Sequence, residues 1–376
     1  MIRIEEFKAG VNQIGYDDTY FLPTNIRDEW SWTNAEINLL LEKAATKLGA
    51  LNSYARFVPN IDLFIKLHVT KEAVISSKIE GTQTNIEEAL LPQSEIHPER
   101  RDDWSKVNNY VEAMNMAIEQ LKELPLSSRL IRNTHQILLQ SVRGEHKLPG
   151  EFRRSQNWIG GRSLADATFI PPHHDHLQDL MGDLEHFLHN DKIPALIRIS
   201  IAHYQFETIH PFLDGNGRIG RLLITLFLVS QEFLSQPLLY LSSYFESDRR
   251  LYYDNLMIVR KENNLTQWIK YFLVGIEQTA HQAIDTLSTI LDLKSETEQY
   301  ISKNFGRRSR AAIVLLQHLF KHPIINVEQA KEATQLSFKA ANDLVKMMVD
   351  HDILTEMTGQ SRNRMFQFKT YIDAFK

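Results

Sequence analysis

The helical spacing of its apolar residues constrains this chain more than any other feature. Residues 61–81, IDLFIKLHVTKEAVISSKIEG, have apolar side chains at positions 61, 64, 65 and 75 and a closing glycine, which is typical of a capped helix. Similar spacing recurs in five further segments: 105–123, 127–141, 176–189, 220–234 and 265–292. Strand-like stretches are short and rare. We therefore predict a mostly α-helical fold.

Composition places the chain among ordinary globular proteins. Its 376 residues suffice for two or three domains, and 43% are hydrophobic and 24% charged. There is no cysteine, which excludes disulfides, thiolate zinc sites and a cysteine nucleophile. The start, MIRIEEFKAG, lacks the apolar core of a signal peptide, and the apolar run 222–229 is too short to cross a bilayer. We expect a soluble cytoplasmic protein with no membrane partner.

The C-terminal residues differ from the rest in charge. Residues 303–376 hold 12 Lys and Arg against 7 Asp and Glu, a net +5, whereas the remainder holds 30 against 40, a net −10. After RSRAAIVLLQHLF, helices are expected at 326–334 and 337–350, followed by a hairpin with Gly359 at its tip. Three helices and a basic hairpin resemble a winged helix. This predicts a domain boundary near 295–305.

A winged helix has two common uses. DNA would meet the third helix and the wing, through the basic or amide side chains of Lys339, Asn342, Lys346, Arg362 and Arg364. Winged helices also dock proteins, and a charge of +5 is modest. DNA binding through 303–376 therefore stays open beside a protein contact or a homodimer, which the modest charge favours.

A polar loop, HPFLDGNGRIGR at 210–221, lies between two apolar segments. Gly215 and Gly217 allow successive backbone N–H groups to point into one concavity, a nest that suits phosphate oxygens. The helix that begins there adds its positive N-terminal end. Arg218 and Arg221 are three apart, so they lie on one side of the first turn. The loop thus predicts an anion-binding site.

Two further side chains extend the chemistry of this loop. At pH 7 the Asp214 carboxylate can accept hydrogen bonds but not donate them. It suits a Mg²⁺ ion that bridges phosphates. His210 is a base that titrates near neutrality. A plain helix N-cap would explain Asp214 and one glycine, but not the histidine, Asn216 and both arginines together.

The loop also contains a misleading pattern. GNGRIG at 215–220 satisfies G-x-G-x-x-G, and IRISIAHY at 197–204 alternates like a strand. In a Rossmann fold, however, the first glycine follows the strand directly, and here QFETIHPFLD intervenes. We therefore reject a dinucleotide-binding fold.

The whole loop resembles the signature of the Fic family, HPFx[D/E]GNGRxxR, at every fixed position. The resemblance implies a helical core that binds ATP and transfers AMP to a target hydroxyl, releasing pyrophosphate. It implies that His210 deprotonates the hydroxyl and that Asp214 holds Mg²⁺. It further implies a phosphate site, with Arg221 nearer the γ-phosphate, made of Gly215, Asn216, Gly217, Arg218 and Arg221.

A second motif extends the resemblance. Some Fic proteins carry an inhibitory helix with [S/T]-x-x-x-E-[G/N], and SSKIEG supplies Ser76, Glu80 and Gly81. Ser76 and Glu80 are four residues apart and share a helix face. In the family this glutamate pairs with the second arginine of the signature, here Arg221, and blocks the γ-phosphate. A solvated helix end is the alternative reading of so short a motif.

The resemblance implies two more contacts. PGEFRRSQNWIGG at 149–161 and ATFIPP at 167–172 are similar to the segment before the signature, where a hairpin flap, here about 158–172, holds the target by strand addition. An exposed hairpin with no partner is the alternative. Tyr253 stands where related proteins place an adenine contact, although tyrosines at this spacing are more often core residues.

A histidine-rich stretch follows the flap. Its spacing fits no standard metal site, and a solvated turn and helix face explain it better. We therefore expect no metal at the histidines of this stretch, and Mg²⁺ only with the nucleotide. The histidines are His173, His174, His176, His186 and His189.

These observations predict a helical segment at 1–104 with an inhibitory helix at about 61–81, a Fic core at 105–300 and a winged helix at 301–376. The expected activity is adenylylation of Ser, Thr or Tyr hydroxyls, self-modification included, with inhibition by Glu80. Removal of AMP and phosphoryl transfer at the same site remain alternatives, although phosphate-transferring relatives have lysine at the position of Gly217. A DNA-binding regulator with a nucleotide-sensing site is the rival from another class.

Overall fold

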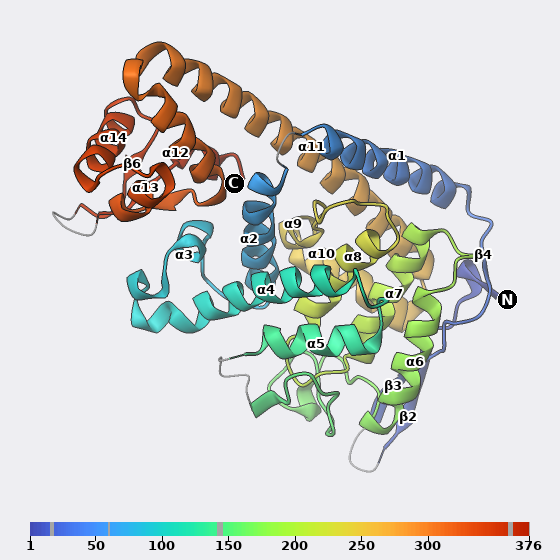
Figure 1. The fold of residues 1–376 in the computed structure, drawn as a ribbon. Helices are drawn as coiled ribbons and strands as arrows, with labels where there is room; N and C mark the ends of the chain where they lie inside the picture. The colour runs from blue at the N-terminus through green and yellow to red at the C-terminus, as the bar shows by residue number, and fades with distance from the viewer. Residues whose placement is uncertain (16–18, 59–60, 141–145, 360–363, 376) are drawn as a thin grey trace.

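The computed structural model describes residues 1–15, 19–58, 61–140, 146–359 and 364–375. Helices dominate it, and the strands are short (Figure 1). The predicted mostly α-helical fold class is confirmed. None of the helices in these residues is long and apolar enough to span a bilayer.

The chain begins with strands that the sequence analysis missed. β1 (Ile2–Arg3) pairs in parallel with β4 (Trp30–Ser31), and β2 (Gly10–Ile14) pairs antiparallel with β3 (Thr19–Pro23). Val11 and Ile14 of β2 are exposed, so no clean alternation of apolar and polar residues marks this hairpin. The segment 1–104, expected to be helical, therefore starts with short strands before its first α-helix.

Two long helices form one side of the molecule. α1 (Ala35–Phe57) packs along the first part of α11 (Leu265–Asn304), as the blue and orange ribbons in Figure 1 show. Asn34 caps α1 by accepting hydrogen bonds from two backbone N–H groups of its first turn. α11 runs twelve residues beyond its predicted end at 292, because Ile301 and Phe305 are buried in the C-terminal core.

The central helices surround a buried pair. α7 (Ala195–Ile209) and α8 (Asn216–Ser230) pack against each other and are almost wholly buried. The strand-like alternation at 197–204 is therefore misleading, because α7 is buried on all sides. Around them lie α4 (Arg101–Gln120), α5 (Ser128–Leu138), α6 (Leu177–Leu188), α9 (Ser242–Ser247) and α10 (Arg249–Glu262).

A second hydrophobic core is centred on the winged helix and also includes Phe64, Leu67 and Ile86. It comprises α12 (Ser309–Lys321), β5 (Ile324–Ile325), α13 (Val327–Thr334), α14 (Phe338–Asp350), β6 (Thr355–Glu356), β7 (Phe366–Gln367) and α15 (Lys369–Asp373). Its strands form a sheet in the order β5-β7-β6. α3 (Ile86–Leu90) and α2 (Asp62–Ile79) lie between this core and the central helices (Figure 1).

Candidate active site

The polar loop joins α7 to α8. His210 ends α7 in the left-handed conformation, with φ of 50°, and its N–H donates to Phe206 O at 2.9 Å. Arg153 fixes this unusual backbone from the side, because its Nε donates to His210 O at 3.0 Å. A non-glycine residue in this region costs about 1–2 kcal/mol, which such contacts must offset.

The side chain of Asn216 fixes the fold of the loop. Its Oδ1 accepts from Phe212 N–H and its Nδ2 donates to Phe212 O, both at 2.8 Å. The amide is therefore occupied within the loop. The backbone at the start of α8 stays open to an anion, because the first N–H groups of a helix have no acceptor within it.

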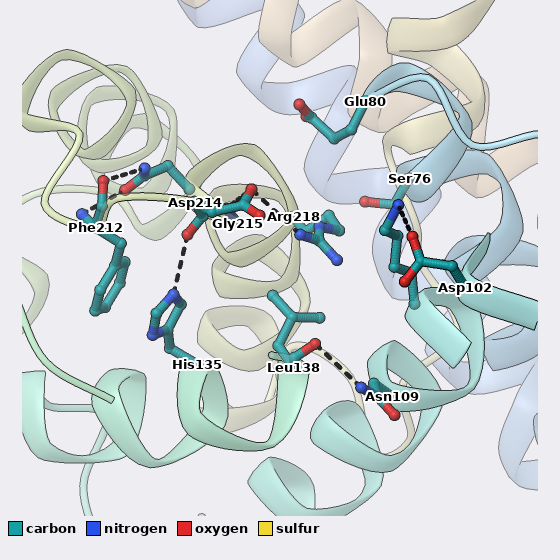
Figure 2. A network of polar contacts seen from close by, with 12 residues as sticks. Ser76, Glu80, Asp102, Asn109, His135, Leu138, Phe212, Asp214, Gly215 and Arg218 are labelled. Atoms are coloured by element: carbon teal, nitrogen blue, oxygen red, sulfur yellow. Dashed lines mark hydrogen bonds and ion pairs between the residues drawn. The ribbon is translucent and has the colours of Figure 1, made fainter. Parts of the chain in front are cut away.

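His135 supports the loop from α5, and the sequence analysis did not find it. Gly150 N–H donates to His135 Nδ1 at 2.9 Å, so the proton is on Nε2, which lies 3.0 Å from Asp214 O (Figure 2). Burial lowers the pKa of His135 to about 4, which keeps the ring neutral. The ring stacks on Phe212 at a centroid distance of 3.7 Å.

Arg218 is a buried cation with unused donors. Its side chain is 5% exposed, and Nη2 lies 3.5 Å from Asp214 Oδ1 (Figure 2). Nε and Nη1 have no hydrogen-bond partner among the described residues. Buried guanidinium donors without partners are costly, so an anionic ligand is expected here.

Arg221 is held by α2. Its Nε donates to Ser76 Oγ at 2.9 Å, and Nη2 donates to Ser76 O at 2.8 Å and to Glu80 Oε1 at 2.7 Å. Burial alone would lower the pKa of Arg221, but the Glu80 carboxylate raises it above its ordinary value. Gly81 follows with φ of 98°, where its N–H donates to Lys78 O and ends the helix.

A cavity of about 500 Å³ opens between the flap, the loop and α10. Five predicted site residues line it together: Glu80, His210, Gly217, Arg221 and Tyr253 of α10. Burial, with Arg260 and Arg153 nearby, lowers the pKa of His210 to about 3, so the imidazole is neutral at pH 7. The cavity thus places a neutral base beside a buried cation.

Comparison with known proteins identifies the family. Residues 38–119 match the model described as the Fic/DOC family N-terminal region, and residues 125–228 match the Fic/DOC family model. This chain therefore contains a Fic/DOC N-terminal region and a Fic/DOC domain.

Known relatives differ in sequence identity to this chain and in the length over which they align with it. A probable protein adenylyltransferase from Aquifex aeolicus is 24% identical over 314 residues, which cover 76% of this chain and 95% of the relative. The protein adenylyltransferase Fic of Drosophila mojavensis is 41% identical over 83 residues, 21% of this chain and 15% of the relative. The chain therefore aligns with only a small part of that insect protein.

Solved Fic structures share the fold at low sequence identity. A Fic family protein from Desulfovibrio desulfuricans has a TM-score of 0.57 at 18% identity, covering 89% of this chain and 96% of that one. A Fic domain containing signaling protein from Bacteroides thetaiotaomicron has a TM-score of 0.51 at 19% identity, covering 68% and 97%.

The Fic flap is a minimal hairpin. Ile159 and Phe169 form a single antiparallel bridge, and Phe21 N–H of β3 donates to Ile170 O at 2.9 Å. The segment around Phe169 is therefore paired on both sides. The other edge, near Trp158, is exposed, with 41% of that residue accessible.

Part of the histidine-rich stretch forms a cluster of possible metal ligands. Ligand atoms of His173, His174 and Asp175 lie within 4.8 Å of one another, a spacing that a metal ion could bridge. His189 Nε2 instead lies 2.7 Å from Leu126 O. The expectation that no metal binds at these histidines stays a prediction.

The surface of the winged helix that was predicted to contact DNA contains acidic as well as basic side chains. Arg364 Nη2 donates to Asn342 Oδ1 at 3.1 Å, and both line a groove that also contains Glu95 and Glu328. Acidic walls do not favour a polyanion. Arg362 lies outside the described residues.

Proposed function

We propose that this protein is an adenylyltransferase that transfers AMP from ATP to a Ser, Thr or Tyr hydroxyl of a protein, itself included. One observation carries the proposal: a neutral histidine and two buried arginines converge on a glycine-containing helix start beside a nucleotide-sized cavity. The names of the relatives are consistent with it.

The reaction assigns a role to each side chain of the loop. The target oxygen attacks the α-phosphorus, the bond from that phosphorus to the bridging oxygen breaks, and pyrophosphate leaves. His210 takes the hydroxyl proton. The backbone of Gly215, Asn216 and Gly217, with Arg218 and Arg221, would neutralise the phosphates.

Asp214 suits a Mg²⁺ ion. The side chain is 47% exposed, and its Oδ1 accepts from Gly215 N–H at 2.6 Å, while Oδ2 has no partner in the part of the chain described. A half-exposed carboxylate with a free oxygen beside a phosphate site fits a hard cation. The ion would neutralise phosphate charge.

Glu80 inhibits the enzyme by occupying the phosphate site. A Cβ at Gly217 would overlap Glu80 Oε1, so the carboxylate lies against the glycine of the nest. Its pairing with Arg221 removes the guanidinium that a γ-phosphate would need. Ser76 holds the same arginine in the inhibited position.

Other surfaces follow from the same proposal. Tyr253 would contact the adenine, because it lines the cavity and is 38% exposed. The free edge of the flap near Trp158 would take the target segment as an added strand. A homodimer or a protein contact is proposed for the winged helix, and location in the cytoplasm stays a prediction.

The test uses wild type, Glu80→Gly and Glu80→Gly/His210→Ala with α-labelled ATP and Mg²⁺. Glu80→Gly should label protein about ten- to hundredfold more than wild type, and the double variant should not label. Thermal unfolding checks that all three fold. Absence of α-label from every folded variant contradicts the proposal, while transfer of γ-label alone would indicate phosphoryl transfer. Loss of AMP from premodified target would indicate hydrolytic removal of AMP, in which water attacks the phosphorus.

A further inference from the structure

The cavity wall carries two charged side chains that the proposed reaction does not use. Apart from tyrosines, its ionisable residues are Glu80, Glu207, His210, Arg221 and Arg260. Three of them belong to the phosphate end. Glu207 and Arg260 remain, on α7 and α10.

Arg260 is already engaged. Its Nε donates to Thr208 Oγ1 at 3.1 Å and its Nη2 to Glu207 O at 2.9 Å. Its guanidinium lies over the ring of Phe169 at 3.9 Å, which ties the flap to the end of α7. Arg260 thus acts on backbone and flap, and among the described residues it makes no ion pair with the Glu207 carboxyl.

The Glu207 carboxyl, by contrast, is buried without a partner. The residue is 6% exposed, and neither carboxyl oxygen has a hydrogen bond or ion pair among the residues with described positions. Oε1 lies against Gly220, where a Cβ would overlap it. A buried carboxyl without hydrogen bonds is rare and costly, and a ligand in the cavity is the partner it lacks.

The cavity that Glu207 lines also has apolar and aromatic walls. Trp158 and Phe169 of the flap face the same cavity as Tyr252 and Leu256 of α10. Apolar and aromatic walls with few polar groups are typical of sites for planar ligands. A carboxyl oxygen in such a wall accepts a hydrogen bond from an amino group, and it repels a carbonyl oxygen at the same place.

We propose that Glu207 determines the base specificity of the site by accepting a hydrogen bond from the exocyclic amino group of adenine. This inference rests on the proposed nucleotide substrate. It predicts that ATP is preferred over a purine nucleotide with hydrogen or oxygen at that position. Burial raises the pKa of Glu207 to about 7. Above that pH, loss of one hydrogen bond to the charged acceptor corresponds to about tenfold to a hundredfold in affinity.

The experiment measures binding of ATP and of purine riboside triphosphate, which lacks the amino group, by titration calorimetry. All variants carry Glu80→Gly, which opens the phosphate end. The parent, which carries Glu80→Gly alone, should bind ATP about ten- to hundredfold more tightly than the analogue. Adding Glu207→Ala should abolish this difference, and adding Glu207→Gln, which keeps an acceptor oxygen, should preserve most of it.

Met257→Ala is the matched control, because it also lines the cavity but offers no polar acceptor of this kind. It should weaken both nucleotides alike. The inference is overturned if the parent does not discriminate, or if Glu207→Ala weakens both nucleotides equally, as a residue that only supports Arg221 would. A parent that does not discriminate overturns the inference even where Glu207→Ala fails to fold. Since binding is measured without transfer, a parent that discriminates but labels no protein would refute the proposed function alone.

Discussion

At the scale of single residues, Arg221 receives most of its contacts from one helix. Ser76 contributes both its hydroxyl and its carbonyl, and Glu80 contributes a carboxylate. The guanidinium is 1% exposed, whereas the Glu80 side chain is 37% exposed. The inhibitory side chain is therefore the accessible partner, and it can leave without moving the arginine.

Ser76→Ala should relieve inhibition in part. The substitution removes one hydrogen bond to Arg221 and leaves the Glu80 pair, so adenylylation should rise about two- to tenfold, less than in Glu80→Gly. Initial rates with α-labelled ATP measure this. Ser77→Ala is the control, because the buried Ser77 hydroxyl has no partner among the described residues. Equal rates in Ser76→Ala and wild type would contradict a role for Ser76.

At the scale of elements, α2 contains a buried acid in its middle. Glu72 accepts hydrogen bonds from Tyr110 and Ser242. Burial raises the pKa of Glu72 to about 7. An unfolded glutamate has a pKa of about 4.3, so the folded protein binds an extra proton between about pH 4 and 7. Stability therefore falls as pH rises through this window.

Glu72→Gln should remove this pH dependence, because the amide keeps an acceptor for both hydroxyls and does not ionise. The variant should gain stability over wild type progressively from about pH 4 to 7, reaching up to about 3 kcal/mol above pH 7. Thermal unfolding at several pH values measures the difference. Glu119→Gln, at a side chain 72% exposed, should show no such trend. A constant difference at all pH values would be inconsistent with the raised pKa.

Element boundaries also show what periodicity can predict. α2 was predicted at 61–81 and spans Asp62–Ile79, because its glycine end is a local signal. α8 was predicted from 220 but begins at Asn216. The polar signature loop hides its first turn, since glycines and arginines there break the apolar pattern that marks a helix.

At the scale of the whole molecule, α2 joins the two hydrophobic cores. Its first half packs on the winged helix, where Phe64 lies 5.4 Å from Phe320 and His68 lies 4.8 Å from Phe375, measured between ring centroids. Its last turns hold Arg221. The winged helix therefore supports the helix that inhibits the site.

Phe375→Ala should loosen the first half of α2 and raise adenylylation severalfold in a chain that has Glu80. It should not raise activity further in Glu80→Gly, where inhibition is already absent. Comparing labelling rates in both backgrounds measures this dependence. Val345→Ala, in the same core on α14, should lower stability without raising the rate. An equal increase in both backgrounds would show that the effect does not pass through Glu80.

The sequence by itself determined the family, the helical class, the polar loop and the inhibitory motif. These are local patterns, in which covalent spacing alone places side chains on one turn or one helix face. Tertiary structure decided that His135 and Arg153 hold the loop, that Glu207 stands unpartnered in the cavity and that the winged helix supports α2. Those contacts join segments far apart in the chain, and they arise from packing between elements, which no local periodicity encodes.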